Sequence, residues 1–414
     1  MRYSKRFDNG LKLIINKMEG FVSVSCGVLV KTGSINESEK DNGISHFIEH
    51  VMFKGTKNRT AFEISDHIDR IGAQINAFTS KELTCYYTKS TGEHLENSLE
   101  VLSDIFFNSV FDSNELEKEK GVIIEEINMS EDTPEELCLD LLAKSYYGNT
   151  GLGQTILGPE KNIKRFTRDD VKRYMDKYYT ADNVVISLSG DLDVEKAQEL
   201  VEKYFAQKFK SKKCAAQKKA KIVPAQSLYK SKRIEQTHLG FAMQGFSMHD
   251  DKSDAASIAN IILGGGMSSR LFQKIREELG LAYSVYSYGS QYKDNGVIEI
   301  CAGVNTAQRD LAAEAIISEV KKFKKDGVTE QEFLRGKEQI KSAFIMGRES
   351  TSSQMLLYGK YLLFLDEVFD VETRLKKLES ITLKDVLEVI DGSFDIEKAA
   401  TATVGSKRSA IKLG

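Results

Sequence analysis

Two histidines and a glutamate stand close together in the segment GISHFIEHVMFKGT, residues 43–56. If this segment is helical, His46 and His50 lie one above the other, and Glu49 points to the same side. Two imidazoles at this spacing bind one zinc ion, and a carboxylate beside them acts on the water that the metal holds. The pattern therefore predicts a zinc hydrolase site.

A solvated helix face with two surface histidines is the alternative explanation. Only 6 histidines occur among the 414 residues, so chance should produce this spacing in about one such chain in a hundred. A helical wheel also separates the motif from the apolar side of the helix. The predicted buried stripe is Ile44, Phe47, Ile48 and Val51, whereas the motif residues and Phe53 fall on the other side.

A catalytic zinc site needs a third protein ligand and an open position for water. The segment LEKEKGVIIEEINM, residues 116–129, offers Glu119 and Glu126, which share a helix face because they are two turns apart. A carboxylate on an apolar face normally binds a metal or pairs with a cation. An ion pair with a core Arg or Lys, or a helix rotated to expose both glutamates, explains the positions equally well. The apolar residues predicted on that face are Leu116, Val122, Ile123, Ile127 and Met129.

These residues resemble a known family, the pitrilysin and insulysin type of zinc peptidases, the inverzincins, whose signature is His-x-x-Glu-His. The resemblance implies that Glu126 is the third zinc ligand and that Glu119 contributes to catalysis, by orienting ligands or supplementing their charge. It extends through residues 76–87, 157–185 and 264–288. The chain is most similar to the short-chain branch, which includes the mitochondrial processing peptidases and their bacterial relatives.

The same resemblance implies two peptide-binding groups. Asn76, Ala77 and Phe78 lie in a strand-like segment that the family uses as an exposed edge, to which substrate adds as an extra strand. Ordinary sheet pairing is the alternative from the residues alone. Arg276 and Tyr283, in REELGLAY, match a pair that holds substrate backbone and stabilises the oxyanion. Without the resemblance they are a surface arginine and a packing tyrosine.

The elements that position these residues repeat in the two halves of the chain. Each half has an apolar strand, then a helix, aromatic-rich strand segments and later helices. This order indicates gene duplication with the metal motif kept only in the first copy. The matching strands are 22–30 and 238–246, and the aromatic segments are 75–87 and 282–292; the helices match at 45–53 and 256–266, at 94–107 and 307–325, and at 115–127 and 330–340.

We therefore predict an α+β fold of two homologous domains, each a mainly antiparallel sheet faced by helices. The N-terminal zinc-binding domain spans residues 1–208 and the C-terminal domain residues 225–414. Residues 209–224 form an exposed Lys-rich linker between them. A nucleic-acid or membrane-surface patch is the alternative for this basic stretch.

Composition excludes several classes of protein. Lys+Arg 58 against Asp+Glu 61 gives a net charge of −3, so no basic field indicates nucleic acid. The Cys count of 5, without CxxC spacing, is typical of reduced thiols in a cytoplasmic protein. No apolar run reaches the length of a membrane span, and the strand pattern begins almost at once, so we expect neither membrane binding nor a signal peptide.

These features predict a zinc endopeptidase with one zinc per chain, acting on oligopeptides or unfolded, presequence-like segments with Glu49 as general base. We expect a homodimer in which Arg276 and Tyr283 of one subunit face the zinc ligands of its partner. A heteromeric partner remains an alternative. The alternative function is a catalytically silent scaffold or partner subunit, although such relatives usually lose a ligand or the base.

Overall fold

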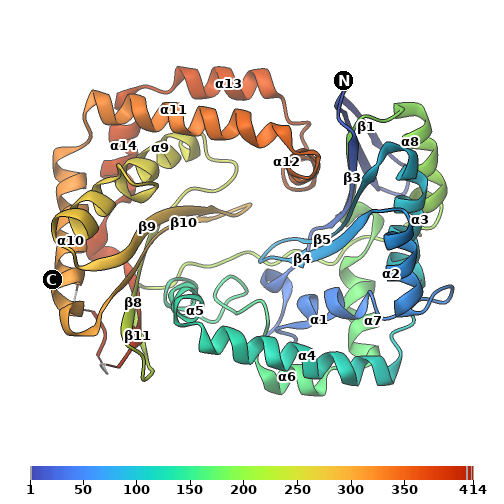
Figure 1. Ribbon diagram of the computed structural model, residues 1–414, viewed down its shortest axis with the longest axis horizontal. Helices are drawn as coiled ribbons and strands as arrows, with labels where there is room; N and C mark the ends of the chain where they lie inside the picture. The colour runs from blue at the N-terminus through green and yellow to red at the C-terminus, as the bar shows by residue number, and fades with distance from the viewer. Residues whose placement is uncertain (1, 407–408, 412, 414) are drawn as a thin grey trace. The chain divides into compact units, whose positions relative to one another are not determined.

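Two mixed, mainly antiparallel sheets organise the chain, which the computed structural model describes over residues 2–406, 409–411 and 413 (Figure 1). Each sheet is the centre of one unit. Unit 1 comprises Met1–Ile127, Thr155–Lys218 and Ile345–Phe369, and unit 2 comprises Asn128–Gln154, Lys219–Phe344 and Asp370–Gly414. The predicted α+β class with two sheet-centred domains is confirmed.

The sheet of unit 1 has the strand order β1-β2-β6-β3-β5-β4. Only β2 and β6 run parallel; the other neighbours are antiparallel. Alternate residues of β3 face a core that includes helix residues Leu99 and Leu102, because side chains alternate between the two faces of a strand. The strands are β1 Arg2–Arg6, β2 Lys12–Lys17, β3 Ser23–Val30, β4 Gln74–Thr79, β5 Thr84–Thr91 and β6 Val184–Gly190.

The helices around this sheet begin with α1, which carries the predicted zinc motif. They are α1 Ile44–Val51, α2 Ala61–Arg70, α3 Leu95–Asn108, α4 Ser113–Asp132, α6 Glu160–Arg165, α7 Arg168–Tyr178, α8 Val194–Val201 and α12 Thr351–Phe364. A π-helical turn, η4 Glu202–Ala206, follows α8, and short 3-10 turns lie at η1 Ser34–Asn36, η2 Gly92–His94, η3 Ala181–Asn183 and η7 Gly347–Glu349.

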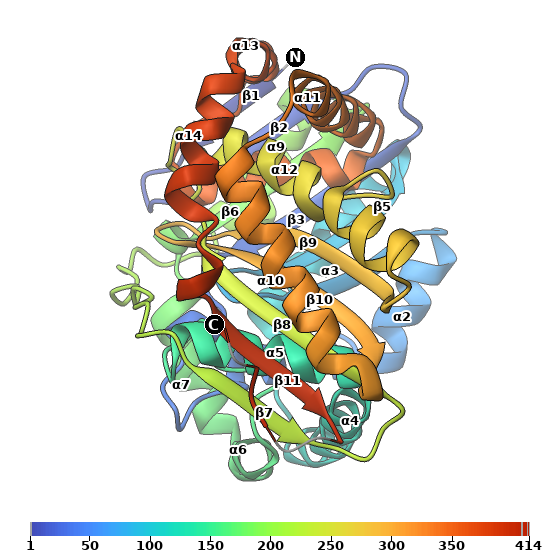
Figure 2. The ribbon, with the colours of Figure 1, turned by 90° about the vertical axis from the view of Figure 1, so that its left-hand side faces the viewer.

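The sheet of unit 2 has the order β7-β11-β8-β10-β9, with β7 and β11 parallel. In Figure 2, α10 crosses the face of this sheet that is turned to the viewer. The strands are β7 Ser227–Ser231, β8 Gln236–Gln244, β9 Ala282–Gln291, β10 Gly296–Asn305 and β11 Ala400–Gly405. The helical elements are α5 Pro134–Tyr147, α9 Ser253–Gly264, η5 Phe272–Glu278, η6 Thr306–Gln308, α10 Arg309–Asp326, α11 Glu330–Met346, α13 Val371–Ser380, α14 Leu383–Ser393 and η8 Ile396–Lys398.

The two sheets share one topology. Starting from the parallel pair, β2-β6-β3-β5-β4 in unit 1 matches β7-β11-β8-β10-β9 in unit 2, and both end on an edge strand. In each unit the helix that follows the long central strand, α1 or α9, comes before the strand pair at that edge. The internal repeat read from the sequence therefore appears in the strand order.

Two helices lie in the unit that the other half of the chain builds. In unit 1, α12 packs on the face of β3 opposite the main core, where Ser25 Oγ and Thr351 Oγ1 are 2.9 Å apart and Ser187 Oγ donates to Met355 O at 2.7 Å. In unit 2, α5 packs on β8 and β11, with the Cys138 thiol 3.9 Å from Ala402 O. Helices therefore cover both faces of each sheet.

The compact units therefore differ from the continuous ranges 1–208 and 225–414. Residues 128–154 belong to unit 2 and residues 345–369 to unit 1. Burial explains the difference, because a sheet face lined by small and apolar residues needs a covering helix, and the chain supplies it from its other half. Sequence periodicity carries no information about which sheet a helix covers.

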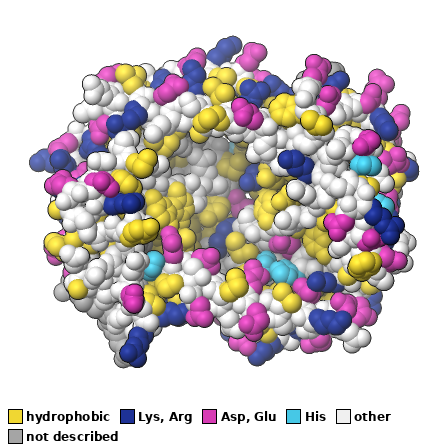
Figure 3. All heavy atoms as spheres, in the orientation of Figure 1, with side chains coloured by type: hydrophobic (Ala, Val, Ile, Leu, Met, Phe, Trp, Pro, Cys, Tyr) yellow, Lys and Arg dark blue, Asp and Glu magenta, His cyan; other side chains and the backbone are white. Residues whose placement is uncertain are grey.

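The Lys-rich linker contains no helix or strand, but part of it is bound to unit 1. Ala215 N donates to Lys177 O at 3.0 Å, and Asn36 donates to the Gln217 side chain at 2.6 Å. The Lys218 ammonium donates to Glu37 O at 2.7 Å. Residues 215–218 are therefore attached to unit 1, with Ala215 and Gln217 partly buried and Ala216 and Lys218 exposed. On the face drawn in Figure 3, basic and acidic side chains are interspersed over the surface.

Candidate metal centre

Helix α1 is held by an apolar stripe and an acidic cap. Ile44, Phe47, Ile48 and Val51 are all fully buried, as the helical wheel predicts. At the start of the helix the buried Glu37 carboxylate accepts from Gly43 N at 2.8 Å and Ser45 N at 2.9 Å. Negative charge at a helix N-terminus satisfies its free N–H groups and stabilises the helix. The apolar stripe and the Glu37 cap therefore fix the orientation of α1 and of the motif side chains that it carries.

Gly43 supplies the backbone conformation that starts α1. Its φ is 98°, and a Cβ there would lie 2.6 Å from Leu157 O. A side chain at this position would be strained by the backbone and would clash with a carbonyl.

Three side chains converge beside α1. His46 Nε2 and His50 Nε2 each lie 3.5 Å from Glu126 Oε2 of α4. Ligands about 2.0–2.2 Å from a tetrahedral zinc are separated by roughly 3.3–3.5 Å, so these atoms fit the edges of such a tetrahedron. Within the described ranges, this is the group of three potential ligands close enough to hold one ion.

Protonation favours a cation at the same point. Glu119 Oε2 lies 3.1 Å from His50 Nδ1, and a carboxylate accepts, so Nδ1 carries the proton and Nε2 presents its lone pair. When His50 is neutral, that lone pair faces the negative oxygen of Glu126 across 3.5 Å, and a cation between the two atoms stabilises the arrangement. A proton on Nε2 is one such cation, and the raised pKa of His50 reflects it.

The pKa directions agree with metal binding for two of the ligands. Burial, aided by the nearby charge of His50, lowers the pKa of His46 to about 4, so its imidazole is neutral at physiological pH. The hydrogen bond with His50 lowers the pKa of Glu126 despite partial burial. Burial opposes the charged form of His50, but Glu126 and Glu119 overcome it and raise the pKa. Protons therefore compete with a metal chiefly at His50.

Glu119 is buried and bound on both oxygens. One oxygen contacts His50, and the other lies 2.6 Å from Lys54 Nζ. Glu119 is thus an ion-paired carboxylate that orients a candidate ligand, while Glu126 points to the convergence point. The apolar face predicted for α4 is only partly correct, since Val122 is 51% and Met129 71% exposed, whereas Leu116 and Ile123 are buried. The helix buries a narrower stripe than the predicted one.

Glu49 lies beside the three convergent side chains and is held by the edge strand. Thr79 Oγ1, at the last residue of β4, donates to Glu49 Oε2 at 2.6 Å. Burial raises the pKa of Glu49, and the Thr79 hydrogen bond opposes this shift. A raised pKa makes the Glu49 carboxylate a better proton acceptor, and its second oxygen is the one left to take the proton.

Strand β4 is an edge strand, paired only with β5. Asn76 is exposed on it, and its side-chain oxygen accepts from Ala77 N at 2.8 Å. The Phe78 ring packs against Tyr87 with centroids 6.3 Å apart. The predicted strand and its edge position are present, next to the helix that carries Glu49.

Arg276 and Tyr283 lie in unit 2, at the end of η5 and the start of β9. The guanidinium carbon of Arg276 is 5.5 Å from the centre of the Tyr283 ring, and Tyr283 is 76% exposed. The two side chains therefore form a cation–π pair on the surface of unit 2.

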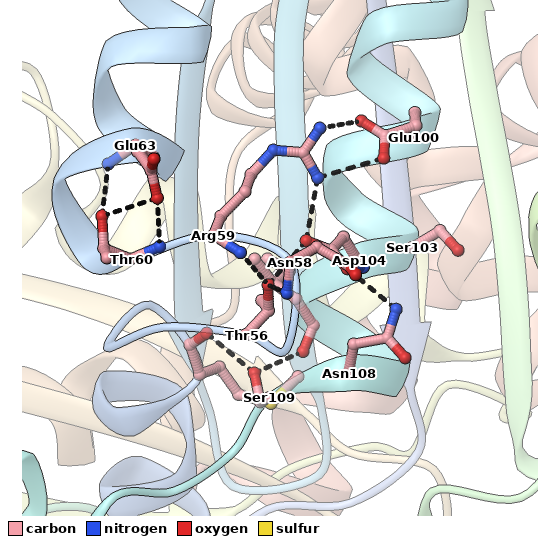
Figure 4. Close-up of polar contacts among 12 residues, drawn as sticks. Thr56, Asn58, Arg59, Thr60, Glu63, Glu100, Ser103, Asp104, Asn108 and Ser109 are labelled. Carbon is pink, nitrogen blue, oxygen red and sulfur yellow. Dashed lines mark hydrogen bonds and ion pairs between the residues drawn. The ribbon is translucent and has the colours of Figure 1, made fainter.

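The loop that leaves α1 is anchored to α3 (Figure 4). Both Arg59 guanidinium nitrogens bind Glu100, at 3.0 and 2.7 Å, and one also binds Asp104 at 2.8 Å. Thr56 and Asn58 donate to the same Asp104 carboxylate at 2.7 and 2.6 Å. The chain beyond the zinc motif is therefore fixed at a charged cluster that centres on the buried Asp104.

Sequence reasoning missed three supporting residues: Thr79, Glu37 and Lys54. Thr79 and Lys54 had detectable signals, because Thr79 follows Phe78 in the edge segment and Lys54 is one helical turn beyond His50. Glu37 lies in an irregular loop and had no such signal.

Two family models match successive parts of the chain. Residues 13–160 match the family described as Insulinase (Peptidase family M16), and residues 165–340 match the Peptidase M16 inactive domain. A Bacillus subtilis protein named as an uncharacterized zinc protease is 42% identical over 378 residues, 91% of this chain and 92% of its own length. The chain belongs to peptidase family M16.

A second relative and a solved structure extend the likeness over most of the chain. An uncharacterized zinc protease of Streptomyces coelicolor is 33% identical over 387 residues, which are 92% of this chain and 84% of that protein. The crystal structure of a Helicobacter pylori protease has a TM-score of 0.90 at 24% identity, over 98% of this chain and 99% of that one, which shows the fold. Names of zinc proteases among M16 relatives support protease activity in general.

The M16 description of the second half as inactive agrees with the place of the motif, since His-x-x-Glu-His occurs at residues 46–50. Among the described residues, no helix of this M16 chain is both long and apolar enough to cross a bilayer.

Proposed function

We propose that this M16 protein is a zinc-dependent endopeptidase acting on oligopeptides or unfolded, presequence-like segments. The observation that carries the proposal is the convergence of His46 Nε2, His50 Nε2 and Glu126 Oε2, with Glu49 beside them. Three protein ligands leave a position open, as in catalytic rather than structural zinc sites. We infer one zinc per chain.

Zinc bound there would polarise the peptide carbonyl and make the attacking water more acidic. The protein's own groups do the rest. The second carboxylate oxygen of Glu49 accepts a proton from the water, and Glu49 then passes this proton to the leaving amine. Thr79 keeps the other oxygen in place through its hydrogen bond. Glu119 holds His50 in the tautomer that leaves Nε2 free.

Substrate binding would use the free edge of β4. An extended peptide pairing with Asn76, Ala77 and Phe78 would run along the strand that ends at Thr79, and thus toward Glu49. Extended pairing requires an unfolded substrate, because a folded protein presents few free strands. Arg276 and Tyr283 are proposed to hold the peptide backbone and the developing oxyanion.

We also propose a homodimer in which Arg276 and Tyr283 of one subunit complete the zinc site of the partner. The exposure of Tyr283 and its contact with Arg276 support a pair that is free to face another molecule. A cytoplasmic location is supported by the five free cysteines, of which Cys26, Cys85, Cys138 and Cys301 are buried.

The test combines metal analysis with cleavage of a random peptide pool. Glu49→Gln should keep zinc and the fold but lower turnover by about a hundredfold or more, because the general base is removed and the ligands remain. The matched control is Glu199→Gln, at an exposed glutamate on α8, which should leave turnover unchanged. Metal-loaded Glu49→Gln with turnover close to wild type would exclude Glu49 as the base. A wild-type protein that binds zinc but cleaves nothing would favour the silent-subunit alternative.

A further inference from the structure

Glu319 of α10 is a largely buried residue whose carboxylate has no partner in the part of the chain that the structure describes. The residue is only 9% exposed, and among the described residues no hydrogen bond or ion pair reaches it. Burial raises its pKa, although the more distant charges of Lys322, Arg270 and Lys274 oppose the shift. The Glu319 oxygens are not among the side-chain atoms buried without a partner, so they open onto solvent, where a cation from outside the chain can reach them.

Glu319 lines a pocket of about 740 Å³ within unit 2. The walls come from η5, the C-terminal end of α10, and the segment that leads into α11. The charged lining residues are Arg270, Lys274, Glu277, Glu278, Glu319, Lys322, Asp326 and Glu332. Acidic side chains outnumber basic ones in this lining.

Two of the three basic side chains are already neutralised. Arg270 binds both Glu332 oxygens, at 2.8 and 2.9 Å, and donates to Gly327 O at 2.8 Å. Lys274 is paired with Glu278. Glu277 is 3.7 Å from Arg276. Of the lining cations, only Lys322 is left to balance Glu319 and Asp326. The unbalanced charge of the pocket is therefore negative.

The helix ends around the pocket agree with this sign. The pocket lies at the C-terminal end of α10, where the helix dipole favours a positive charge. Two N–H groups at the start of α11 are occupied, since Thr329 N donates to Glu332 Oε2 at 2.8 Å and Glu332 N donates to Thr329 Oγ1 at 3.3 Å. An anion would find no excess of cations in this lining.

A bare metal ion does not suit the pocket. Within the described ranges, the group of residues close enough to share one ion is His46, His50 and Glu126, all in unit 1. The carboxylates of the pocket are too far apart for that. Separated carboxylates in an open pocket match positive groups spaced along a flexible chain.

We propose that this pocket binds a primary ammonium group carried on an aliphatic chain, with Glu319 as its counter-ion. Two sources offer this chemistry: a free polyamine and the lysine side chain of a peptide. The competing explanation is internal, because Lys322 lies three residues beyond Glu319 on the same helix and another rotamer could pair them.

Isothermal titration of the full-length Glu49→Gln protein tests the proposal without any turnover. Spermidine is one ligand. The other is an acetylated and amidated peptide with a single lysine, with norleucine in its place as the control. We expect Glu319→Gln to weaken binding at least tenfold and Glu314→Gln, at an exposed residue of α10 outside the pocket, to leave it unchanged. Lys322→Gln should tighten binding, because it removes a competing cation.

If only spermidine binds in a Glu319-dependent way, the pocket is a polyamine site. If only the lysine peptide does, the pocket is a peptide subsite. Either result supports the binding of an ammonium group. Absence of binding by either ligand at millimolar concentration overturns it, as does equal binding by Glu319→Gln. Weaker binding by Lys322→Gln would also contradict it. Thermal unfolding of each variant verifies that the comparison is between folded proteins.

Discussion

Thr79 connects the strand proposed to bind substrate with the proposed general base. Its hydroxyl donates to Glu49 at 2.6 Å from the end of an edge strand. Removing a hydrogen bond to a charged group costs about 1.5–3 kcal/mol. Thr79→Val should therefore lower kcat about tenfold or more with little change in KM, and Thr79→Ser should retain most of the activity. Steady-state kinetics on one peptide checks this, and equal loss in the serine variant would show that the methyl group matters instead.

Glu126 and Glu119 make different contacts and should respond differently to the same change. Glu126→Gln removes a proposed ligand, so zinc affinity and activity should fall together. Glu119→Gln leaves three ligands but loosens His50, an effect typically of about 10–100-fold. Zinc titration against a competing chelator gives both affinities. Unchanged affinity in Glu126→Gln would exclude it as a ligand.

At the residue scale, the sequence predicted what depends on local spacing. His46, Glu49 and His50 share a helix face in any α-helix. Glu119 and Glu126 were ambiguous from the residues, since an ion pair explained them as well as a metal. The structure contains both arrangements: Glu119 pairs with Lys54, and Glu126 faces the two histidines. Glu37 could not be found, because its role depends on a loop folding back onto α1.

At the element scale, Asp104 fixes the loop after α1 to α3. Burial opposes its charged form, but hydrogen bonds from Asn108, Thr56 and Arg59 prevail and lower its pKa. A depressed folded pKa stabilises the protein above the unfolded pKa, about 3.9 for Asp. That stability is lost as the pH falls below this value through the folded pKa.

Asp104→Asn should therefore destabilise the protein by about 1–3 kcal/mol near pH 7. The difference in stability between the two proteins should shrink as the pH falls below the unfolded value of about 3.9 and through the lowered pKa of Asp104, because the wild-type carboxylate then also becomes neutral. Thermal unfolding of both proteins across this range measures the gap. Asp176→Asn, at an exposed residue of α7, is the control and should show neither effect. A gap that stays constant with pH would mean that the charge of Asp104 is unimportant.

Helices and strands were predictable where apolar periodicity is strong. The predicted segments 94–107 and 307–325 correspond to α3 and α10, each within a few residues. The face of α4 was less predictable, because Val122 and Met129 are apolar but exposed. The exchange of α5 and α12 was not predictable, since it depends on which sheet face lacks a cover.

At the scale of the whole molecule, the proposed homodimer makes a sharp prediction. Glu49→Gln and Tyr283→Phe chains should each be inactive, but a mixture that exchanges subunits should regain part of the activity, because one of the two mixed sites carries neither lesion. Peptide cleavage after mixing gives the measurement, and differently tagged chains verify exchange. Exchange without recovered activity, or full activity in a strictly monomeric wild type, would contradict the arrangement.

The exchanged helices change what a cut in the chain would do. A protease that opens the linker between Lys218 and Lys219 leaves an N-terminal fragment with α5 and a C-terminal fragment with α12. Each unit then consists of pieces from both fragments, and neither fragment alone can cover its own sheet. The nicked protein should stay together as a non-covalent pair, and the separated halves should recover their structure only when they are refolded together.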